Sequence, residues 1–425
     1  MTYTEALDYI HSISWTFCKP GLERITELCK KLGDPQKNLK FIHVAGTNGK
    51  GSFCAMMDSI LRESGMKVGL YTSPYIRFFN ERMCVNGLPI SNGELAELTA
   101  YVRPFADEMT DKPTEFELIT AIAFEFFKRH SCDIVILEAG MGGRLDSTNI
   151  IRDPYLSVIT GIALDHTAFL GDTVEKIALE KAGIIKDNAP VLYGGTDDSA
   201  AEVIETVAVK VGSAFNRVDY SELTVQSSSL EGTDFKYGKY DDLKISLLGA
   251  YQPRNASVVI NAVEILRTRG LNITDKDLYN GLARAKWQGR FEIIMREPLM
   301  IFDGAHNPQG IRGAVESIKN YFGDEKVYLL TGVLRDKDYT AIAKDLAIVA
   351  SKAFTLTPDS PRALNSVDYA ETLCKAGIEA TPSESLEEAL KKAVDAAVTD
   401  KKPLMCLGSL YVYSSLMDIV EHDYK

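Results

Sequence analysis

A glycine-rich turn that carries one lysine and one serine is the segment of this chain best suited to chemistry. Residues 41–52 read FIHVAGTNGKGS, where an apolar run leads into Gly46, Thr47, Asn48, Gly49, Lys50, Gly51 and Ser52. Glycines let the backbone approach an anion closely, and a following helix N-terminus points its N–H groups at the same place. The spacing departs from the common P-loop, which has four residues between its first glycine and Gly-Lys-Ser/Thr. The lysine and serine nevertheless favour a nucleotide phosphate site over an ordinary strand-to-helix loop.

Side chains with oxygen or nitrogen donors follow three further apolar runs. Glu138 ends IVILE, Ser73 ends KVGLYTS, and His166 follows VITGIALD. The carboxyl ends of parallel strands share one edge of a sheet, where ligands collect. A carboxylate and a hydroxyl at that edge suit Mg²⁺, which prefers oxygen ligands. The alternatives are a solvated glutamate at a strand end and a histidine that only forms hydrogen bonds.

Three other positions allow two interpretations each. Lys181 falls at the end of a helical pattern, where it could simply favour the helix dipole or face solvent. Asp303 and His306 belong to DGAHNP, which could face a nucleotide or form an ordinary turn. Arg290 could contact phosphate near a domain boundary, although most single arginines are surface charges.

Strand-like runs alternate with helical patterns along the chain. The runs LKFIHVAG, KVGLYTS, CDIVILEAG, YLSVITGI and APVLYGG are short and apolar, and helices are expected over 115–127, 174–182 and 254–267. This alternation predicts an α/β fold with a P-loop-type, mostly parallel sheet in an N-terminal domain, residues 1–295. A second, smaller Rossmann-like α/β domain is expected over residues 296–425, from PLMIFDGA, KVYLLTGVL, AFTLTP and PLMCLGS. The polar, alternating segment 209–248 is expected to extend the first domain as antiparallel strands.

Composition excludes several classes of protein. The chain has 425 residues and a formal net charge of −12, which predicts two domains and argues against nucleic-acid or membrane-surface binding. The start lacks the pattern of a secretory signal, and no apolar stretch reaches the length of a membrane span. Seven scattered cysteines without a CxxC pair fit reduced thiols in a cytoplasm, most of them as small core residues.

Taken together, the motifs resemble those of the folylpolyglutamate synthases. This family includes the bifunctional dihydrofolate synthases and belongs to the wider Mur ligase superfamily of ATP-dependent amide-bond ligases. The matching segments cover nearly the whole chain in family order: GTNGKGS (46–52), TSPY (72–75), EAGMGGRLDSTN (138–149), LDH (164–166), GDTVEKIALEKAGIIK (171–186), WQGR (287–290), DGAHNP (303–308) and GSLYV (408–412).

The resemblance implies a role for each candidate residue. Gly46, Thr47, Asn48, Gly49, Lys50, Gly51 and Ser52 would bind the ATP phosphates, and Asn255, Arg290 and Asp303 would contact ATP. Ser73, Glu138, His166 and a carbamylated Lys181 would hold two magnesium ions. Phe116, Arg144, Asp146, Ser147 and Thr148 lie at or beside the family's folate site, and His306 and Ser409 would seat glutamate. Lys50, Lys181 and His306 would be the catalytic residues.

The implied reaction joins L-glutamate to folate. ATP would first phosphorylate a carboxylate to an acyl phosphate, which the glutamate amine would then attack. Use of dihydropteroate as a second acceptor stays open, and the family suggests a monomer. The alternatives are another Mur-type amide ligase and a nucleotide-binding switch without ligase chemistry. The LDH, EKAG and DGAHNP segments disfavour a simple switch, which needs neither a second metal site nor a second domain.

Overall fold

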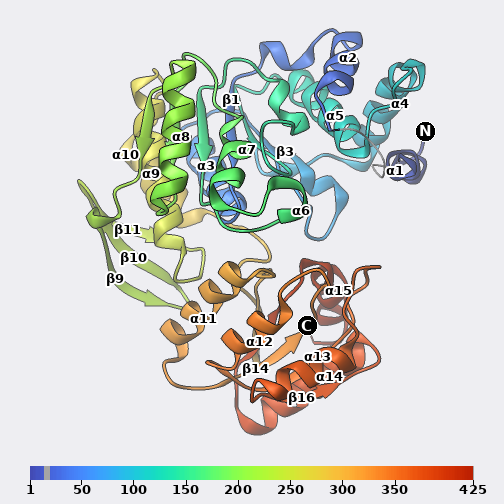
Figure 1. Ribbon diagram of the computed structural model, residues 1–425, viewed down its shortest axis with the longest axis vertical. Coiled ribbons are helices and arrows are strands. Elements are labelled where there is room, and N and C mark those ends of the chain that lie inside the picture. Colours follow the sequence, from blue (N-terminus) through green and yellow to red (C-terminus); the bar gives the residue numbers. More distant parts are fainter. Residues whose placement is uncertain (14–19, 425) are drawn as a thin grey trace. The chain divides into compact units, whose positions relative to one another are not determined.

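The computed structural model describes residues 1–13 and 20–424, which form two compact units (Figure 1). The first unit comprises residues 1–75, 79–223 and 254–285, and the second comprises 76–78, 224–253 and 286–425. The α/β class expected from the sequence is confirmed in both. No helix within the described ranges is long and apolar enough to cross a membrane.

The first unit is built on an eight-stranded sheet. Its strands are β1 (Phe41–Ala45), β2 (Val68–Tyr71), β3 (Met83–Val85), β4 (Leu88–Pro89), β5 (Ile134–Glu138), β6 (Leu156–Ile159), β7 (Val191–Tyr193) and β8 (Phe215–Arg217), in the order β4-β3-β2-β5-β1-β6-β7-β8. The six strands from β2 to β8 in this order are parallel, and only β3 and β4 run antiparallel to their neighbours. The mostly parallel sheet is therefore confirmed. The chain passes from β1 to β2 on one side of the sheet and from β5 to β6 on the other, so the carboxyl ends of the adjacent strands β1 and β5 form a topological switch point, where ligands bind in such sheets.

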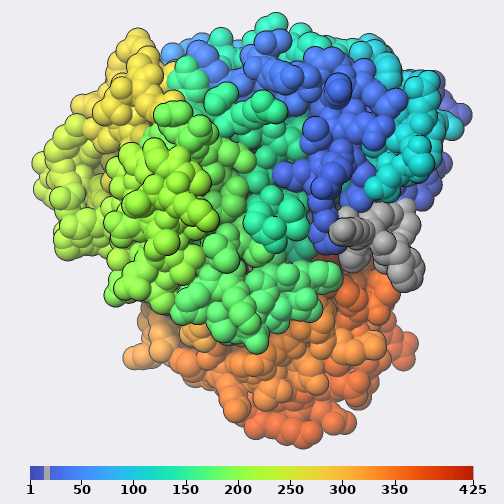
Figure 2. Space-filling model, turned by 45° about the horizontal axis from the view of Figure 1, so that its top comes forward, coloured from blue at the N-terminus to red at the C-terminus, as the bar shows by residue number. Residues whose placement is uncertain are grey.

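Helices cover this sheet. They are α1 (Tyr3–Ser12), α2 (Glu23–Lys31), α3 (Lys50–Glu63), α4 (Asn92–Glu108), α5 (Glu115–Arg129), α6 (Thr167–Leu170), α7 (Val174–Ala182), α8 (Asp198–Val211), α9 (Gln252–Thr268) and α10 (Asp275–Arg284), with short 3-10 turns η1 (Pro35–Asn38), η2 (Phe79–Arg82), η3 (Ser147–Ile150) and η4 (Tyr220–Glu222). Two local signals set the start of α5: Thr114 accepts from the Glu117 N–H, and Glu117 accepts from the Thr114 N–H. The green segment that contains the short α6 lies at the surface (Figure 2).

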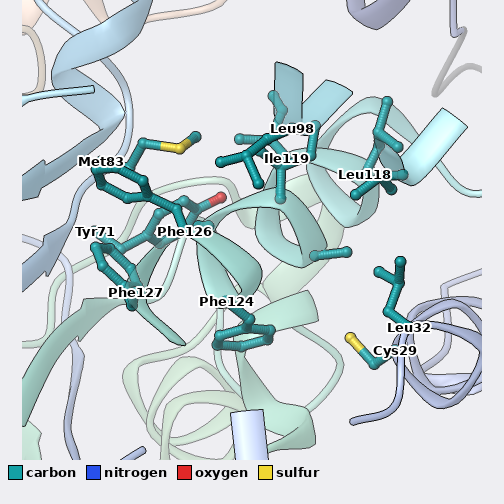
Figure 3. Packing of buried hydrophobic residues seen from close by; sticks show 14 of the residues in the cluster. Cys29, Leu32, Tyr71, Met83, Leu98, Leu118, Ile119, Phe124, Phe126 and Phe127 are labelled. Carbon is teal, nitrogen blue, oxygen red and sulfur yellow. The ribbon is translucent and has the colours of Figure 1, made fainter. Parts of the chain in front are cut away.

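One hydrophobic cluster fixes α5 against the sheet and the N-terminal helices. Phe124, Phe126 and Phe127 of α5 lie among residues of β2, β3, α4 and the α2 region in Figure 3. All three phenylalanines are almost completely buried, and burying such a side chain contributes about 1.5–3 kcal/mol. This packing holds α5 against the part of the sheet that contains β5, the strand that precedes the loop at residues 139–149.

The second unit contains a six-stranded sheet. Its strands are β12 (Glu292–Arg296), β13 (Leu299–Phe302), β14 (Val327–Thr331), β15 (Ala350–Thr355), β16 (Glu379–Pro382) and β17 (Leu404–Leu407), in the order β12-β13-β17-β14-β15-β16. All pairs are parallel except β12 with β13. The remaining elements are α11 (Pro308–Phe322), α12 (Tyr339–Leu346), α13 (Ser366–Lys375), α14 (Leu386–Asp400), η5 (Leu410–Val412) and α15 (Tyr413–Asp423). Because β13 and β17 are parallel neighbours, the loops that follow them meet at one edge.

The antiparallel strands expected in the middle of the chain exist, but they do not extend the first sheet. They are β9 (Leu223–Ser229), β10 (Gly232–Tyr237) and β11 (Tyr240–Ile245), which form a separate three-stranded sheet (Figure 1). Residues 224–253 group with the second unit. The physical reason is their contact with α11: Asn320 donates to the Ser228 hydroxyl at 2.9 Å, and Ser317 accepts from the Ala250 N–H at 2.9 Å. By their contacts these strands therefore group with the second unit and do not add to the first sheet.

The division of the chain also differs near the expected boundary at residue 295. That position falls inside β12, which pairs with β13 of the second sheet, and the last segment of the second unit begins at residue 286. Among the cysteines, Cys29, Cys54, Cys84, Cys132 and Cys406 are buried free thiols, whereas Cys374 is exposed. Cys18 lies outside the described residues.

Candidate active site

The glycine-rich turn joins β1 to α3 at the centre of the first sheet. Gly46 has φ of +150° and Gly49 has φ of +87°, backbone conformations that L side chains rarely adopt. A Cβ on Gly46 would stand 1.9 Å from the Thr160 hydroxyl, and one on Gly49 would stand 2.8 Å from the Asn255 side-chain oxygen. The turn thus has both the conformation and the neighbours that demand glycine. It also brings Asn255 of α9 against the start of α3.

Hydrogen bonds from the next loop hold this turn in place. The Thr47 N–H donates to the Gly161 carbonyl at 2.6 Å, and the Thr160 hydroxyl donates to the Asn48 carbonyl at 2.8 Å. The Ala163 N–H donates to the Thr47 hydroxyl at 3.1 Å. The turn is therefore fixed by the β6 loop, and α3 begins at Lys50 with its N-terminus directed toward the same place. Such a geometry suits an anion.

Two lysine side chains converge on one carbonyl of the turn. Lys50 Nζ lies 3.0 Å from the Gly46 carbonyl oxygen, and Lys181 Nζ lies 2.8 Å from the same atom. Lys50 comes from the first turn of α3, whereas Lys181 comes from the last turn of α7. The structure thus brings together two residues that are 131 positions apart in the sequence. Neither lysine faces the solvent freely, so the solvated interpretation of Lys181 is wrong.

The amine of Lys181 is buried, and its pKa lies far below the ordinary value for a lysine. Only 4% of it is exposed. Burial, followed by the charge of Lys50, lowers the pKa of Lys181 to about 7 from an ordinary value of 10.5. Asp165 and Asp146 act in the opposite direction but do not outweigh these effects. A large part of Lys181 is therefore uncharged near neutral pH, which makes its nitrogen a nucleophile.

Glu138 lies at the end of β5, beside the turn. It is 4% exposed, its Oε1 is 3.9 Å from Lys50 Nζ, and its Oε2 accepts from the Ser73 N–H at 3.3 Å. The Ser73 hydroxyl accepts from Arg82 at 3.2 Å. A buried carboxylate beside a hydroxyl offers the hard oxygen donors that fit Mg²⁺. Glu138 and Ser73 are therefore brought together as expected.

His166 is less closely tied to this group. It is exposed, has φ of +49°, and stands at the start of α6, where its backbone N–H donates to Asp165 Oδ1 at 2.9 Å. Within residues 1–13 and 20–424, no cluster of three or more His, Cys, Asp and Glu side chains is arranged to hold a metal. The expected metal ligands need no such cluster, since one is a hydroxyl and another a lysine.

The loop after β5 contains most of the residues expected to bind folate. Asp146 is buried, and its two oxygens accept from the backbone N–H of Met141 at 2.9 Å, the backbone N–H of Thr148 at 3.0 Å and the Thr148 hydroxyl at 2.5 Å. Burial is the main cause that raises the pKa of Asp146. Its carboxylate therefore shapes the loop from within. Ser147 is buried beside it, and the Phe116 ring of α5 would lie 2.7 Å from a Cβ on Gly140.

The same loop is attached to the end of α7. The Arg144 N–H donates to the Glu180 carbonyl at 2.8 Å, and the Asn149 side chain donates to the carbonyls of Arg144 and Gly183, both at 3.0 Å. The Arg144 guanidinium also pairs with the Glu180 carboxylate at 2.8 Å, with about half of the arginine side chain exposed. Lys181 and the loop are consequently parts of one local structure.

In the second unit, Asp303 is the centre of a buried network. Its Oδ2 accepts from the Tyr251 hydroxyl at 2.7 Å and from the Phe291 N–H at 2.9 Å, and its Oδ1 accepts from the Ala305 N–H at 2.8 Å. Burial raises the pKa of Asp303, and the nearby Arg290 guanidinium opposes that rise. Arg290 Nη1 would lie 2.3 Å from a Cβ on Gly304. The structure therefore brings Arg290 and Asp303 together.

His306 and Ser409 follow the neighbouring strands β13 and β17. His306 Nδ1 donates to the Gly304 carbonyl at 2.8 Å, which fixes a proton on that nitrogen. Ser409 is 4% exposed and accepts from the Tyr411 N–H at 3.2 Å. The Gly408 N–H donates to the Ala305 carbonyl at 3.0 Å and ties the two loops together. Both residues thus stand at one edge of the second sheet.

Sequence reasoning missed three polar residues that support these sites. His43 lies in the middle of β1, Thr160 follows β6, and Tyr251 precedes α9. A histidine within the otherwise apolar run FIHVA was a usable signal, because an unpaired polar side chain in a buried strand is costly. Thr160 and Tyr251 carried no such signal, since threonine and tyrosine are common in strands and loops.

Comparison with known families first gives the class of protein. The profile of the Mur ligase middle domain matches residues 44–263, and the profile of the Mur ligase glutamate ligase domain matches residues 289–410. The first match contains the glycine-rich turn, Glu138 and Lys181, and the second contains Arg290, Asp303 and His306. The chain thus has the two-domain organisation of a Mur-type ligase.

Relatives that match the whole chain identify the family within this class of ligases. The chain is 36% identical to a folylpolyglutamate synthase of Lacticaseibacillus casei, over 98% of both chains. It is also 36% identical to a dihydrofolate synthase/folylpolyglutamate synthase of Bacillus subtilis, over 97% of this chain and 98% of that one. A solved FPGS–AMPPCP–folate complex is 35% identical and superposes with a TM-score of 0.87, covering 99% of this chain and 100% of the other. The chain belongs to the folylpolyglutamate synthase/dihydrofolate synthase family.

Proposed function

We propose that this protein is an ATP-dependent ligase that joins L-glutamate to a folate through an acyl-phosphate intermediate. The observation that carries the proposal is the convergence of Lys50 and Lys181 on the Gly46 carbonyl, with Glu138 beside them. This group stands next to the loop after β5, which we propose as the folate site. A chain with this site and full-length relatives of this family is an enzyme rather than a nucleotide-binding switch.

The glycine-rich turn would receive the ATP phosphates. Backbone N–H groups from Gly46 to Ser52 and the start of α3 attract anionic oxygens, and Lys50 adds a full positive charge. Asn255 lies against Gly49 and would contact the nucleotide from α9. Arg290 and Asp303 are proposed as further ATP contacts. Their shared network in the second unit holds the carboxylate in a fixed orientation.

Ser73, Glu138, His166 and Lys181 are the proposed magnesium ligands, with two ions in the working enzyme. When bound, magnesium would offset negative charge on the phosphates. Lys181 would first react with CO₂: its uncharged Nζ attacks the carbon, a proton leaves the nitrogen, and a carbamate anion results. The low pKa of Lys181 supports this step, because only the uncharged amine reacts.

The acceptor and glutamate would use the two loop regions. Folate would lie by Phe116, Arg144, Asp146, Ser147 and Thr148, where the buried residues support the loop and Arg144 presents an exposed cation. A folate carboxylate oxygen attacks the γ-phosphorus and ADP leaves. The glutamate nitrogen, after losing a proton, attacks the acyl carbon and inorganic phosphate leaves. His306 and Ser409 would hold glutamate, and the imidazole of His306 is a candidate acceptor for that proton.

A second acceptor, dihydropteroate, is also proposed. The Bacillus subtilis relative carries both dihydrofolate synthase and folylpolyglutamate synthase in its name, at 36% identity over nearly the whole chain. The chemistry is the same amide formation on a different carboxylate. We further propose that the enzyme works as a cytoplasmic monomer, as the family resemblance suggests; sedimentation velocity with and without substrates tests the monomer.

An acceptor panel tests the proposal. Purified protein is given ATP, magnesium and glutamate with dihydropteroate, tetrahydrofolate, its methylene and formyl forms, or no acceptor. Phosphate release that needs both a folate and glutamate, with products one glutamate heavier by mass spectrometry, is the expected result. Release with a UDP-linked peptide would instead identify a cell-wall type of Mur ligase. Slow release without any acceptor would contradict ligase function.

A further inference from the structure

A histidine buried in the central strand forms a hydrogen-bonded chain with the loop proposed to bind folate. His43 is completely buried in β1, between the registered residues Leu137 of β5 and Ser157 of β6. Its Nε2 lies 2.9 Å from the Thr148 hydroxyl oxygen, and that hydroxyl lies 2.5 Å from Asp146 Oδ1. The other ring nitrogen, Nδ1, is buried without a partner.

Hydrogen counting fixes the direction of this chain. Asp146 accepts from two backbone N–H groups, and the single Thr148 hydroxyl proton points to its Oδ1. The hydroxyl oxygen then has lone pairs but no proton for His43, and His43 Nε2 must be the donor. The opposite tautomer would bury an unpaired Nδ1–H and leave two acceptors facing each other at the threonine, which is costly. The ring carries its proton on Nε2 and presents a bare Nδ1.

The ring must also be uncharged. Burial, with a smaller contribution from Lys186, lowers the pKa of His43 to about 3. A charged ring would also need a partner at Nδ1, and none is present among the described residues. His43 therefore keeps one protonation state across the physiological range. That constancy distinguishes it from a histidine that moves protons during a reaction.

The function of this hydrogen-bonded chain follows from the two elements that it connects. His43 shares its strand with the glycine-rich turn, which begins three residues later, whereas Thr148 and Asp146 are part of the loop after β5. Asp146 in turn accepts the Met141 N–H at 2.9 Å, so it draws the two ends of the loop together. His43 stands between two apolar clusters, one containing Phe41 and Leu137 and the other containing Ala45 and Ile159. A polar group at that place has no packing role that leucine could not fill.

We propose that His43 is a positioning residue, which donates from Nε2 to Thr148 and through it orients Asp146 and the folate-binding loop. This inference rests on the proposed function for its consequence, because the loop is the proposed acceptor site. The hydrogen-bonded chain itself is inferred only from interatomic distances and burial. His43 touches no reacting atom and is not a catalytic residue.

The kinetic test uses four variants. His43→Leu removes the donor, His43→Gln keeps an N–H donor of similar reach, and Thr148→Val breaks both links. Ser213→Ala is the matched control, since it removes a buried hydrogen bond of 2.6 Å to the Ala189 carbonyl on the far side of the same unit. For His43→Leu and Thr148→Val we expect the KM for the folate acceptor to rise about tenfold, equivalent to about 1.4 kcal/mol. The KM for ATP should stay at the wild-type value, His43→Gln should recover most of the loss, and the control should change neither KM.

Several results would overturn the proposal. A parallel rise of both KM values would mean that the variants merely disturb β1 and the glycine-rich turn. An unchanged acceptor KM, or additive effects in the His43→Leu/Thr148→Val double variant, would show that the residues do not act as one chain. If the wild-type protein used no folate acceptor, the proposed function would fail, but additivity in unfolding measurements would still test the chain.

A second measurement does not depend on folding of the variants. In wild-type protein labelled with ¹⁵N-histidine, long-range ¹H–¹⁵N correlation spectra separate the two ring nitrogens of each of the six histidines. We expect one ring, assigned to His43 by its contacts with Thr148, that is protonated on Nε2 only and does not titrate between about pH 5 and 9. A proton on Nδ1, or a charged ring in this range, would refute the inference.

Discussion

The buried amine of Lys181 gives the sharpest prediction about the proposed chemistry. An ordinary lysine with a pKa of 10.5 is about 0.1% uncharged at pH 7.5, whereas a lysine with a pKa of about 7 is about three-quarters uncharged. The pool of reactive amine is therefore roughly 700-fold larger. We expect Lys181 to react with CO₂ far faster than any exposed lysine at the same pH.

The measurement is the initial rate of ¹³C-carbamate formation by NMR, at a constant concentration of dissolved ¹³CO₂. Below pH 7 the rate should rise about tenfold per pH unit, and above pH 7 it should level off because nearly all of the amine is already uncharged. Lys181→Met should abolish the signal. Lys50→Met should move the midpoint to higher pH, because the charge of Lys50 lowers the pKa of Lys181.

The same pKa predicts how stability varies with pH. The unfolded chain binds a proton at Lys181 that the folded chain does not bind between about pH 7 and pH 10.5, so stability should rise with pH across this window. The full cost of burying the amine is present below about pH 7 and absent above pH 10.5, and is at most about 5 kcal/mol. Denaturant curves of wild type and Lys181→Met should therefore converge at high pH. A carbamylation rate that keeps rising tenfold per unit up to pH 10, with parallel stability curves, would refute the reasoning.

Three further predictions concern neighbouring features. Glu138→Gln should weaken the magnesium dependence and the turnover together; an unchanged magnesium titration would remove Glu138 from the metal site. Gly183→Ala would place a Cβ 2.4 Å from Arg144 Cα, so it should cost about 1–3 kcal/mol in urea unfolding, whereas Gly93→Ala in α4, with nothing within 4 Å, should be neutral or stabilising. Glu117→Ala removes the nearer carboxylate partner of Arg24, at 2.9 Å, and leaves Asp111 at 3.4 Å, so it should lower stability by about 1–3 kcal/mol; an unchanged stability would show that Asp111 and water compensate for the lost contact.

Much of the fold follows from local patterns in the sequence. The expected helix at 174–182 matches α7 residue for residue, and the apolar runs around Phe41, Ile134 and Leu156 became the three central strands. These elements are predictable because a buried parallel strand must be apolar on both faces, and because Thr173 caps α7. The glycine-rich turn could also be predicted from the sequence, since Gly46 and Gly49 adopt backbone conformations that other residues rarely take.

Other features depend on contacts that the sequence does not contain. Alternation in β9–β11 shows which face is apolar but not which helix covers it, so the sequence could not predict their contact with α11. β16 has mostly exposed residues and no apolar run to mark it. The burial of Lys181 depends on where α7 packs, so its pattern fitted a surface lysine equally well. The role of His43 was not predicted, because its run of apolar neighbours was interpreted only as a buried strand.

The way in which the chain divides between its two units has a consequence for dissection of the protein. The first unit is not a continuous segment, because β9–β11 interrupt it and belong with the second unit. A fragment that ends at residue 285 would retain these three strands but lack α11, so Leu230 and the groups that bond to Asn320, Ser317 and Tyr321 would face water. Swapping halves between homologues at one crossover should therefore produce insoluble hybrids, whereas exchanges that carry residues 224–253 together with the C-terminal part should yield folded ones.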